Sequence, residues 1–193
     1  MGWLETWFDL HCPGCHSQLD APGLCQHCRL VSARVEPGRV WLSSYANFGR
    51  VVRAFKYQNQ RELAEVLATP LALGITQSGF HANGITHVPT DPRRRFWRGY
   101  DQSALLARAI AKLTTIPYQP VLRRTRLAPS QSSRPIAKRH RLPDNLFGSR
   151  FPVNGNWILV DDVFTTGATF QRAERALRQA GAARILAVFI CIS

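Results

Sequence analysis

The stretch ILVDDVFTTGAT, Ile158 to Thr169, joins an apolar run to two adjacent acids and then to hydroxyl residues and a glycine. The apolar residues from Trp157 to Val160 predict a buried strand, and the pattern from Gly167 to Ala180 predicts a helix. A strand followed by a turn and a helix is typical of α/β proteins, in which ligands bind beyond the carboxyl ends of parallel strands. We therefore expect Asp161 and Asp162 to lie at a ligand-binding edge of a parallel sheet.

The residues after the acids predict an anion site. Backbone N–H groups at the start of a helix carry partial positive charge, and Gly167 lets the backbone approach a phosphate closely. Hydroxyl donors come from Thr165, Thr166 and Thr169. A ligand with a phosphate at one end and vicinal hydroxyls nearby, such as ribose 5-phosphate, would suit both the turn and the carboxylates. The alternative is a plain strand-to-helix turn in which Asp162 caps the helix.

Four cysteines lie close together in CPGCHSQLDAPGLCQHC. They form two CxxC pairs, Cys12 with Cys15 and Cys25 with Cys28. Two residues between thiolates suit a tetrahedral ion, so the spacing predicts a closed, structural Zn²⁺ site in a small module. Disulfides are the alternative, which a cytoplasmic location disfavours. The nearby histidines, His11, His16 and His27, either replace one ligand or merely flank the site.

Charge is concentrated in one part of the 193-residue chain. The formal net charge is +13, and the segment Arg93–Arg150 holds fourteen basic residues and two acids. This excess predicts a polyanionic partner, such as a phosphorylated metabolite, pyrophosphate or nucleic acid; a solvated surface is the alternative. No run of about 18 apolar residues occurs, and Glu5 and Asp9 interrupt any signal peptide. We expect a cytoplasmic protein without membrane insertion.

The rest of the pattern alternates helices and strands, which favours one α/β domain with a mostly parallel sheet flanked by helices. We expect a helix over 47–68 with a break near 58–60, a strand over 84–89, a loop over 91–99, a helix over 102–113, a strand within 118–125, an irregular excursion over 114–152 and a final strand over 184–192. Cys191, in the last apolar run, is expected in the core.

Two blocks resemble known families. ILVDDVFTTGAT is similar to the ribose-phosphate loop of type I phosphoribosyltransferases, and VPTDPRRRFWRGYDQSALLARAIA resembles a block of the competence protein F (ComF/GntX) family, which also has N-terminal CxxC pairs. Gln131, Arg139 and Asn145 loosely match a later block of that family. The resemblance implies a type I phosphoribosyltransferase-like fold with a zinc-binding module over 1–40 and the main domain over 41–193.

The resemblance also implies roles for residues of this sequence. The acid pair would contact the ribose 2- and 3-hydroxyls, and the pyrophosphate of phosphoribosyl pyrophosphate would lie, with Mg²⁺, near Arg98 and Gly99. The implied ribose-phosphate set is Asp161, Asp162, Thr165, Thr166, Gly167, Ala168 and Thr169. Asp101 stands where the family usually has Asn. If the site is catalytic, with Asp161 and Asp162 as its catalytic residues, a nucleobase or related nucleophile displaces pyrophosphate.

Two functions compete at this stage. The first is a ComF-family phosphoribosyltransferase-like protein that binds phosphoribosyl pyrophosphate or another ribose phosphate, with a role in DNA uptake and utilisation, DNA serving as a nutrient. The second is a non-catalytic protein that contacts single-stranded DNA, through Arg93, Arg94 and Arg95, or contacts DNA uptake or helicase proteins. Between these arginines and Arg98, Phe96 and Trp97 are expected to be packing anchors rather than base-stacking platforms.

Overall fold

The computed structural model describes residues 11–21, 23–125 and 145–193, and its centre is a five-stranded sheet with the order β1-β2-β7-β6-β3. Its strands are β1 (Arg34–Glu36), β2 (Arg39–Ser44), β3 (Gly84–His87), β6 (Asn156–Phe164) and β7 (Arg184–Ile192). β1 runs antiparallel to β2, and the other neighbouring pairs are parallel. A separate antiparallel pair joins β4 (Leu122–Arg124) to β5 (Phe147–Ser149). The expected α/β class with a mostly parallel sheet is confirmed.

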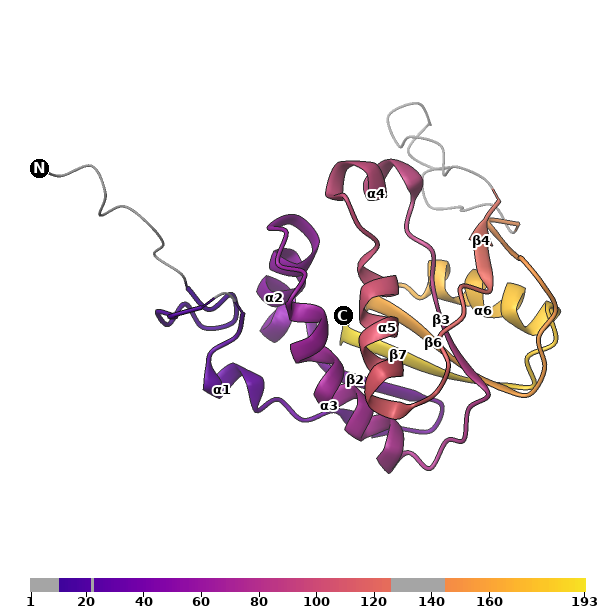
Figure 1. Ribbon diagram of the computed structural model, residues 1–193, viewed down its shortest axis with the longest axis horizontal. Coiled ribbons are helices and arrows are strands. Elements are labelled where there is room, and N and C mark those ends of the chain that lie inside the picture. Colours follow the sequence, from indigo (N-terminus) through magenta and orange to yellow (C-terminus); the bar gives the residue numbers. More distant parts are fainter. Residues whose placement is uncertain (1–10, 22, 126–144) are drawn as a thin grey trace, which may run out of the picture.

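Helices cover both faces of the sheet (Figure 1). One face packs against α2 (Tyr45–Tyr57), α3 (Leu63–Gln77) and α5 (Gln102–Thr114), and the other against α6 (Ala168–Gln179) and the β4–β5 pair. Along β6, Ile158 and Val160 join the first cluster, whereas Trp157 and Leu159 join the second. The apolar run of β6 is therefore continuous because both of its faces are buried.

The sequence predicted the last strand and α5 closely. The expected break in the helix over 47–68 is also confirmed, and it divides the segment into α2 and α3. The break falls after Tyr57, close to the Gln58–Gln60 polar stretch, and α3 then continues through Pro70 to Gln77. Tertiary packing overrides the helix-breaking tendency of this proline, since most residues of α3 are buried. The β1–β2 hairpin was not expected. The short strand within 118–125 is confirmed as β4.

The segment expected to be a loop over 91–99 is instead a helix, α4 (Pro92–Arg98). The Asp91 side chain accepts a hydrogen bond from the Arg93 N–H at 3.0 Å, and Pro92 occupies the first helical position. Gly99 ends the helix in a left-handed conformation with φ 76°. An acid cap, an N-terminal proline and a C-terminal glycine are the standard helix boundaries, so the sequence did carry this signal.

The cysteine module packs onto the main core. It contains the short helix α1 (Gln26–Arg29), and its residues Cys12 and Leu24 are buried in the same cluster as α2 and α3. The division at residue 40 stays a proposal; β2 begins at Arg39 and crosses it. Among the described residues, no helix is both long enough and apolar enough to span a bilayer. Gln131 and Arg139 lie outside the described residues.

Candidate functional site

The acid pair lies inside β6, near its carboxyl end, and not after the strand as expected. β6 continues to Phe164 because Val163 and Phe164 still pair with the last strand, β7. On its other side, β3 ends at His87, opposite Val160. Asp161 and Asp162 therefore lie just beyond the end of β3, at the carboxyl edge of the parallel strands, where ligands bind in such sheets.

Each acid has a partner from a different helix. The Ser103 hydroxyl, on α5, lies 3.0 Å from Asp161 Oδ1, and the Asp162 N–H donates to the same oxygen at 2.9 Å. Lys56 Nζ, at the end of α2, lies 2.8 Å from Asp162 Oδ1. Sequence reasoning missed Lys56 and Ser103. A carboxylate pair demands donors nearby, but these two lie 106 and 58 positions before their acids, so no local pattern revealed them.

Burial and the neighbouring Asp162 carboxylate raise the pKa of Asp161 to about 8, against hydrogen bonds from the Asp162 N–H and Ser103 that lower it. Near neutral pH the pair therefore keeps about one proton, and Lys56 offsets the charge that remains on Asp162.

Asp161→Asn is expected to make the free energy of unfolding less dependent on pH. Because the folded-state pKa is about 8 and the unfolded value is about 3.9, the folded protein keeps a proton that the unfolded chain releases. The parent should lose stability as pH rises through this window, by at most about 1.4 kcal/mol per pH unit. Urea denaturation across the window measures this loss. Exposed Asp20→Asn is the control, and equal pH profiles for parent and Asp161→Asn would contradict the assignment.

The turn after the acids leads into the start of α6. Gly167 is the N-cap residue, with φ 72° and no side chain of its own, and the exposed Thr166 hydroxyl accepts a hydrogen bond from the Ala168 N–H at 3.4 Å. A Cβ at Gly167 would lie 2.6 Å from the Phe164 ring, so the turn requires glycine. The first N–H groups of a helix have no intrahelical acceptor. The alternative in which Asp162 caps this helix is wrong, because Gly167 is the N-cap residue and Asp162 pairs with Lys56.

Arg98, the expected pyrophosphate ligand, ends α4 next to the site. Its guanidinium donates to Gln102 Oε1 and to the Tyr57 hydroxyl, both at 3.1 Å, and lies 4.7 Å from the Tyr57 ring centroid. Both hydrogen-bond partners are neutral. No carboxylate pairs with Arg98 within the described residues, so its charge is available to an anionic ligand.

Asp101 accepts two backbone hydrogen bonds, which explains an acid at this position. One carboxylate oxygen accepts from the Ala104 N–H at 3.1 Å and caps α5, and the other accepts from the Thr90 N–H at 3.0 Å. An Asn side chain has one acceptor oxygen and would leave one N–H without this partner. His87 Nε2 lies 3.8 Å from Asp101, but burial lowers the pKa of His87. Through these two bonds Asp101 links the start of α5 to Thr90, which precedes α4.

The four paired cysteines form a cluster that could hold a metal ion. Their sulfur atoms all lie within 4.8 Å of one another, and Cys15 Sγ is 3.5 Å from Cys25 Sγ. Four thiolates around Zn²⁺ lie about 3.8 Å apart, from a Zn–S distance of about 2.3 Å. A Cβ at Gly14 would lie 2.7 Å from Cys28 Sγ, so glycine makes room for the cluster. The thiols are not joined as disulfides, and the described group of candidate ligands includes none of His11, His16 or His27.

A backbone N–H of α1 lowers the pKa of the Cys25 thiol. The Cys28 N–H donates to Cys25 Sγ at 3.4 Å and is the largest cause of a pKa lowered to about 6. Cys12 Sγ accepts similarly from the Cys25 N–H at 3.4 Å. Because metals bind thiolates, such N–H donors favour the ligating form.

Phe96 and Trp97 are not packing anchors. Their exposed fractions are 84% and 86%, and the rings contact each other edge-on with centroids 6.4 Å apart. Arg93, Arg94 and Arg95 on the same helix are also exposed. No residue of α4 is buried, so this helix turns no face towards the core.

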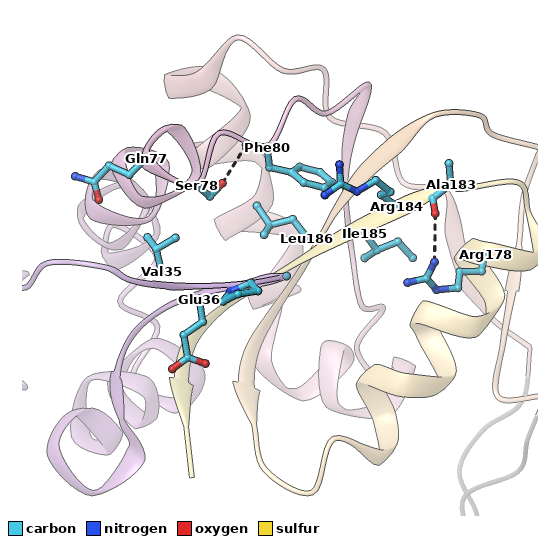
Figure 2. Close-up of a pocket in the computed structure, with 12 residues that line it drawn as sticks. Val35, Glu36, Gln77, Ser78, Phe80, Arg178, Ala183, Arg184, Ile185 and Leu186 are labelled. Atoms are coloured by element: carbon cyan, nitrogen blue, oxygen red, sulfur yellow. Dashed lines mark hydrogen bonds between the residues drawn. The ribbon is translucent and has the colours of Figure 1, made fainter.

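Among the described residues, a pocket lies near each end of the parallel strands. A pocket of about 410 Å³ adjoins the acid pair through Lys56 and is lined by Lys56, Tyr57, Asn59, Arg94, Trp97, Arg98 and Tyr100. A pocket of about 520 Å³ lies at the amino end of β7, where Phe80 stacks on Arg184 and Arg178 donates to the Ala183 carbonyl (Figure 2). The second pocket contains none of the expected site residues.

Comparison with known proteins finds DNA utilization proteins and a competence protein. The chain is 28% identical to DNA utilization protein YhgH of Escherichia coli (strain K12) over 148 residues, which is 73% of this chain and 65% of that protein, just under two thirds of its length. It is 28% identical to YhgH of Salmonella typhimurium, covering 93% of this chain and 83% of that protein. Competence protein F of Haemophilus influenzae is 27% identical, with 90% and 86% covered.

Solved structures with some similarity include an adenine phosphoribosyltransferase, 17% identical with a TM-score of 0.45, covering 68% of this chain and 71% of that one. A glutamine phosphoribosylpyrophosphate amidotransferase from B. subtilis is 22% identical with a TM-score of 0.45, covering 72% and 30%. No family model matches the chain. By sequence, the chain is a homologue of competence protein F and of the DNA utilization proteins.

Proposed function

We propose that the chain binds the ribose 5-phosphate part of phosphoribosyl pyrophosphate, or a related ribose phosphate, in a process that handles DNA. The observation that carries the proposal is the acid pair, held by Ser103 and Lys56, just before the start of α6, where the N-cap residue is a glycine. The carboxylates would accept hydrogen bonds from the ribose hydroxyls, and the turn from Thr165 to Thr169 would donate to the phosphate. The names of the DNA utilization proteins support the link to DNA.

The residues suit a substrate that brings its own Mg²⁺. Within the described chain, the cysteine cluster is the one group of three or more candidate metal ligands, so a Mg²⁺ at the acid pair would rely on one or two carboxylates and the phosphates. This is how Mg²⁺ is often bound. When bound, the ion would neutralise charge on the pyrophosphate. Arg98 would bind the same group and stabilise it as it leaves, if a nucleophile displaces it.

For the cysteine cluster we propose one structural Zn²⁺ held by Cys12, Cys15, Cys25 and Cys28. The donor chemistry, the sulfur spacing and the N–H donors to sulfur support it. Four thiolates complete a tetrahedral site and leave no position for a reacting water. The ion would fix the module against α2, whose last turn carries Lys56.

Calorimetric titration tests the ribose-phosphate proposal. Phosphoribosyl pyrophosphate with Mg²⁺ and ribose 5-phosphate alone should each bind with a stoichiometry near one, and inorganic pyrophosphate serves as the comparison without a sugar. A screen of nucleobases for pyrophosphate release then tests turnover separately. No binding of either sugar at millimolar concentration would refute the proposal.

A second candidate function, binding of single-stranded DNA, is favoured by the exposure of α4. Phe96 and Trp97 present two large rings to solvent directly after the exposed Arg93–Arg95. Aromatic rings that stack bases and cations that contact phosphates are the two components of such sites. This candidate needs no turnover and is compatible with an intact ribose-phosphate site.

Changing Arg93, Arg94 and Arg95 to Ala is expected to weaken single-stranded DNA binding and flatten its dependence on salt. Each phosphate contact contributes a slope of roughly −0.7 in log–log form, so three lost contacts should reduce the slope by about 2. Fluorescence anisotropy with a labelled oligonucleotide at several salt concentrations measures both. Arg50→Ala with Arg53→Ala, on the exposed face of α2, is the control. Binding that ignores salt, or equal slopes for both variants, would count against this surface.

A further inference from the structure

The pocket at the amino end of β7 lies away from the acid pair. Its volume of about 520 Å³ is within the range of about 300 to 1,000 Å³ that small-molecule pockets occupy. Segments far apart in the chain line it: the β1–β2 turn, the end of α3, the end of α6 and the start of β7. Its residue Arg184 lies five positions before Phe189, which pairs with Asp161, so about 16 Å of extended strand separates the two sites.

Hydrogen bonds hold two walls of this pocket in place (Figure 2). On one side, the Ser78 hydroxyl accepts from the Phe80 N–H at 3.3 Å, which fixes the chain just after α3. On the other side, Arg178 donates to the Ala183 carbonyl at 3.3 Å and to Glu174 Oε1 at 2.9 Å. The pocket is therefore pre-formed on both sides, as small-molecule sites usually are.

Arg184 brings an available positive charge to the pocket. Arg178, the other cation of the lining, is paired with Glu174. Among the described residues Arg184 has no carboxylate partner, and its guanidinium lies 5.5 Å from the Phe80 ring centroid. A guanidinium that stacks on a ring by its face keeps the N–H donors at its edge for an anionic ligand.

Glu36 is the one acid among the described residues that line the pocket, and it limits the charge of a ligand. Figure 2 shows its carboxylate pointing away from Phe80 and Arg184. The arginine therefore stays unpaired, but the acid would still repel a ligand with several negative charges. One available guanidinium beside one acid suits a monoanion better than a pyrophosphate or a nucleic-acid strand. A carboxylate is a monoanion that matches the two parallel N–H donors of a guanidinium.

Apolar side chains make up the surface between the two walls. Val35, Phe80, Ile185 and Leu186 supply it, and Val35 is 38% exposed, so part of this surface is open to a ligand. Covering it with a hydrocarbon or aromatic group removes apolar surface from water, which is favourable. The lining as a whole therefore suits a ligand with one negative end and an apolar body.

We propose that this pocket binds a small carboxylic acid with an apolar or aromatic body. The carboxylate accepts two hydrogen bonds from the Arg184 guanidinium, and the body lies against Val35 and Leu186. The pocket shares no lining residue with the acid pair, the turn before α6 or α4. The proposal therefore stands or falls independently of the ribose-phosphate site and of DNA binding.

Titration of the full chain with phenylacetate, followed by heteronuclear NMR, tests the proposal. The largest shifts should fall on the backbone amides of Phe80 and residues 183–186, whereas those of Asp161 and Asp162 should not move. Phenylacetamide should bind at least tenfold more weakly, because it offers no charged acceptor, and acetate should bind more weakly because it has no ring. No binding of phenylacetate at millimolar concentration, equal affinity of acid and amide, or equal shifts with inorganic phosphate would overturn the proposal.

Matched variants separate this contact from general attraction by a basic protein. Arg184→Met removes the guanidinium and should weaken phenylacetate at least tenfold, with little effect on phenylacetamide. Arg184→Lys keeps the charge without the two parallel donors and should give an intermediate loss. Arg175→Met, at an exposed position of α6 outside the lining, is the control and should change neither affinity. The NMR spectrum shows whether each variant is folded, and equal losses in Arg184→Met and Arg175→Met would refute the site.

Discussion

Asp161→Asn combined with Asp162→Asn is expected to weaken the binding of phosphoribosyl pyrophosphate and ribose 5-phosphate by a hundredfold or more. Because the pair keeps about one proton, a hydrogen bond to the charged carboxylate contributes about 1.5 to 3 kcal/mol and one to the neutral carboxyl about 0.5 to 1.5 kcal/mol, and every 1.4 kcal/mol is tenfold in affinity. Both carboxylates are already fixed, by Ser103 and Lys56, so little reorganisation offsets the loss. Calorimetry on parent and double variant measures it.

Thr166→Val is the graded control for this result. The turn before α6 would hold a phosphate mainly through backbone N–H groups, which this substitution leaves in place, so the loss should be far smaller. Circular dichroism of each variant separates lost binding from lost folding. If the double variant is folded and binds both sugars as well as the parent does, the acid pair does not hold the ribose.

Cys25→Ser is expected to lower the zinc content from about one equivalent per chain and to unfold the cysteine module. Metal binding supplies on the order of 10 to 16 kcal/mol to the folding of small zinc modules, and three thiolates hold the ion less tightly than four. Metal analysis of protein purified without added zinc, together with thermal unfolding, measures both effects.

Cys191→Ala is the matched control, because this cysteine is buried in the core and lies outside the cluster. It should leave the zinc content unchanged even if it lowers the melting temperature. A parent protein that is folded, free of metal and disulfide-bonded at all four positions would contradict the zinc proposal.

Local patterns were enough to predict elements with strong periodicity or clear boundaries. The strand at 184–192 has a mostly apolar run, and the helix after Asp101 has apolar residues at helical spacing. Gly167, after the acid pair, marks the turn into α6. The helix α4 was missed although its Asp-Pro start and glycine end were visible, because its arginines dominated the interpretation. For this segment, Asp91, Pro92 and Gly99 were better evidence of structure than the high arginine content.

The tertiary partners of the site could not be predicted in the same way. Lys56 reaches Asp162 only because α2 and β6 pack on each other through long-range contacts. Ser103 reaches Asp161 because α5 begins where β3 has already ended. The exposure of Trp97 likewise depends on α4 standing away from the core, which no property of its own sequence specifies.

The position of β7 in the sheet has a consequence for synthesis. β7 follows both β2 and β6 in the chain, and it pairs with β2 on one side and β6 on the other. Until it emerges from the ribosome, β2 with β1 and β6 with β3 remain two unconnected strand pairs with open apolar edges. Without β7, no strand connects β6, which carries the acid pair, to β2, which leads into α2. We therefore expect Asp161 and Asp162 to meet Lys56 only after β7 has joined the two strand pairs.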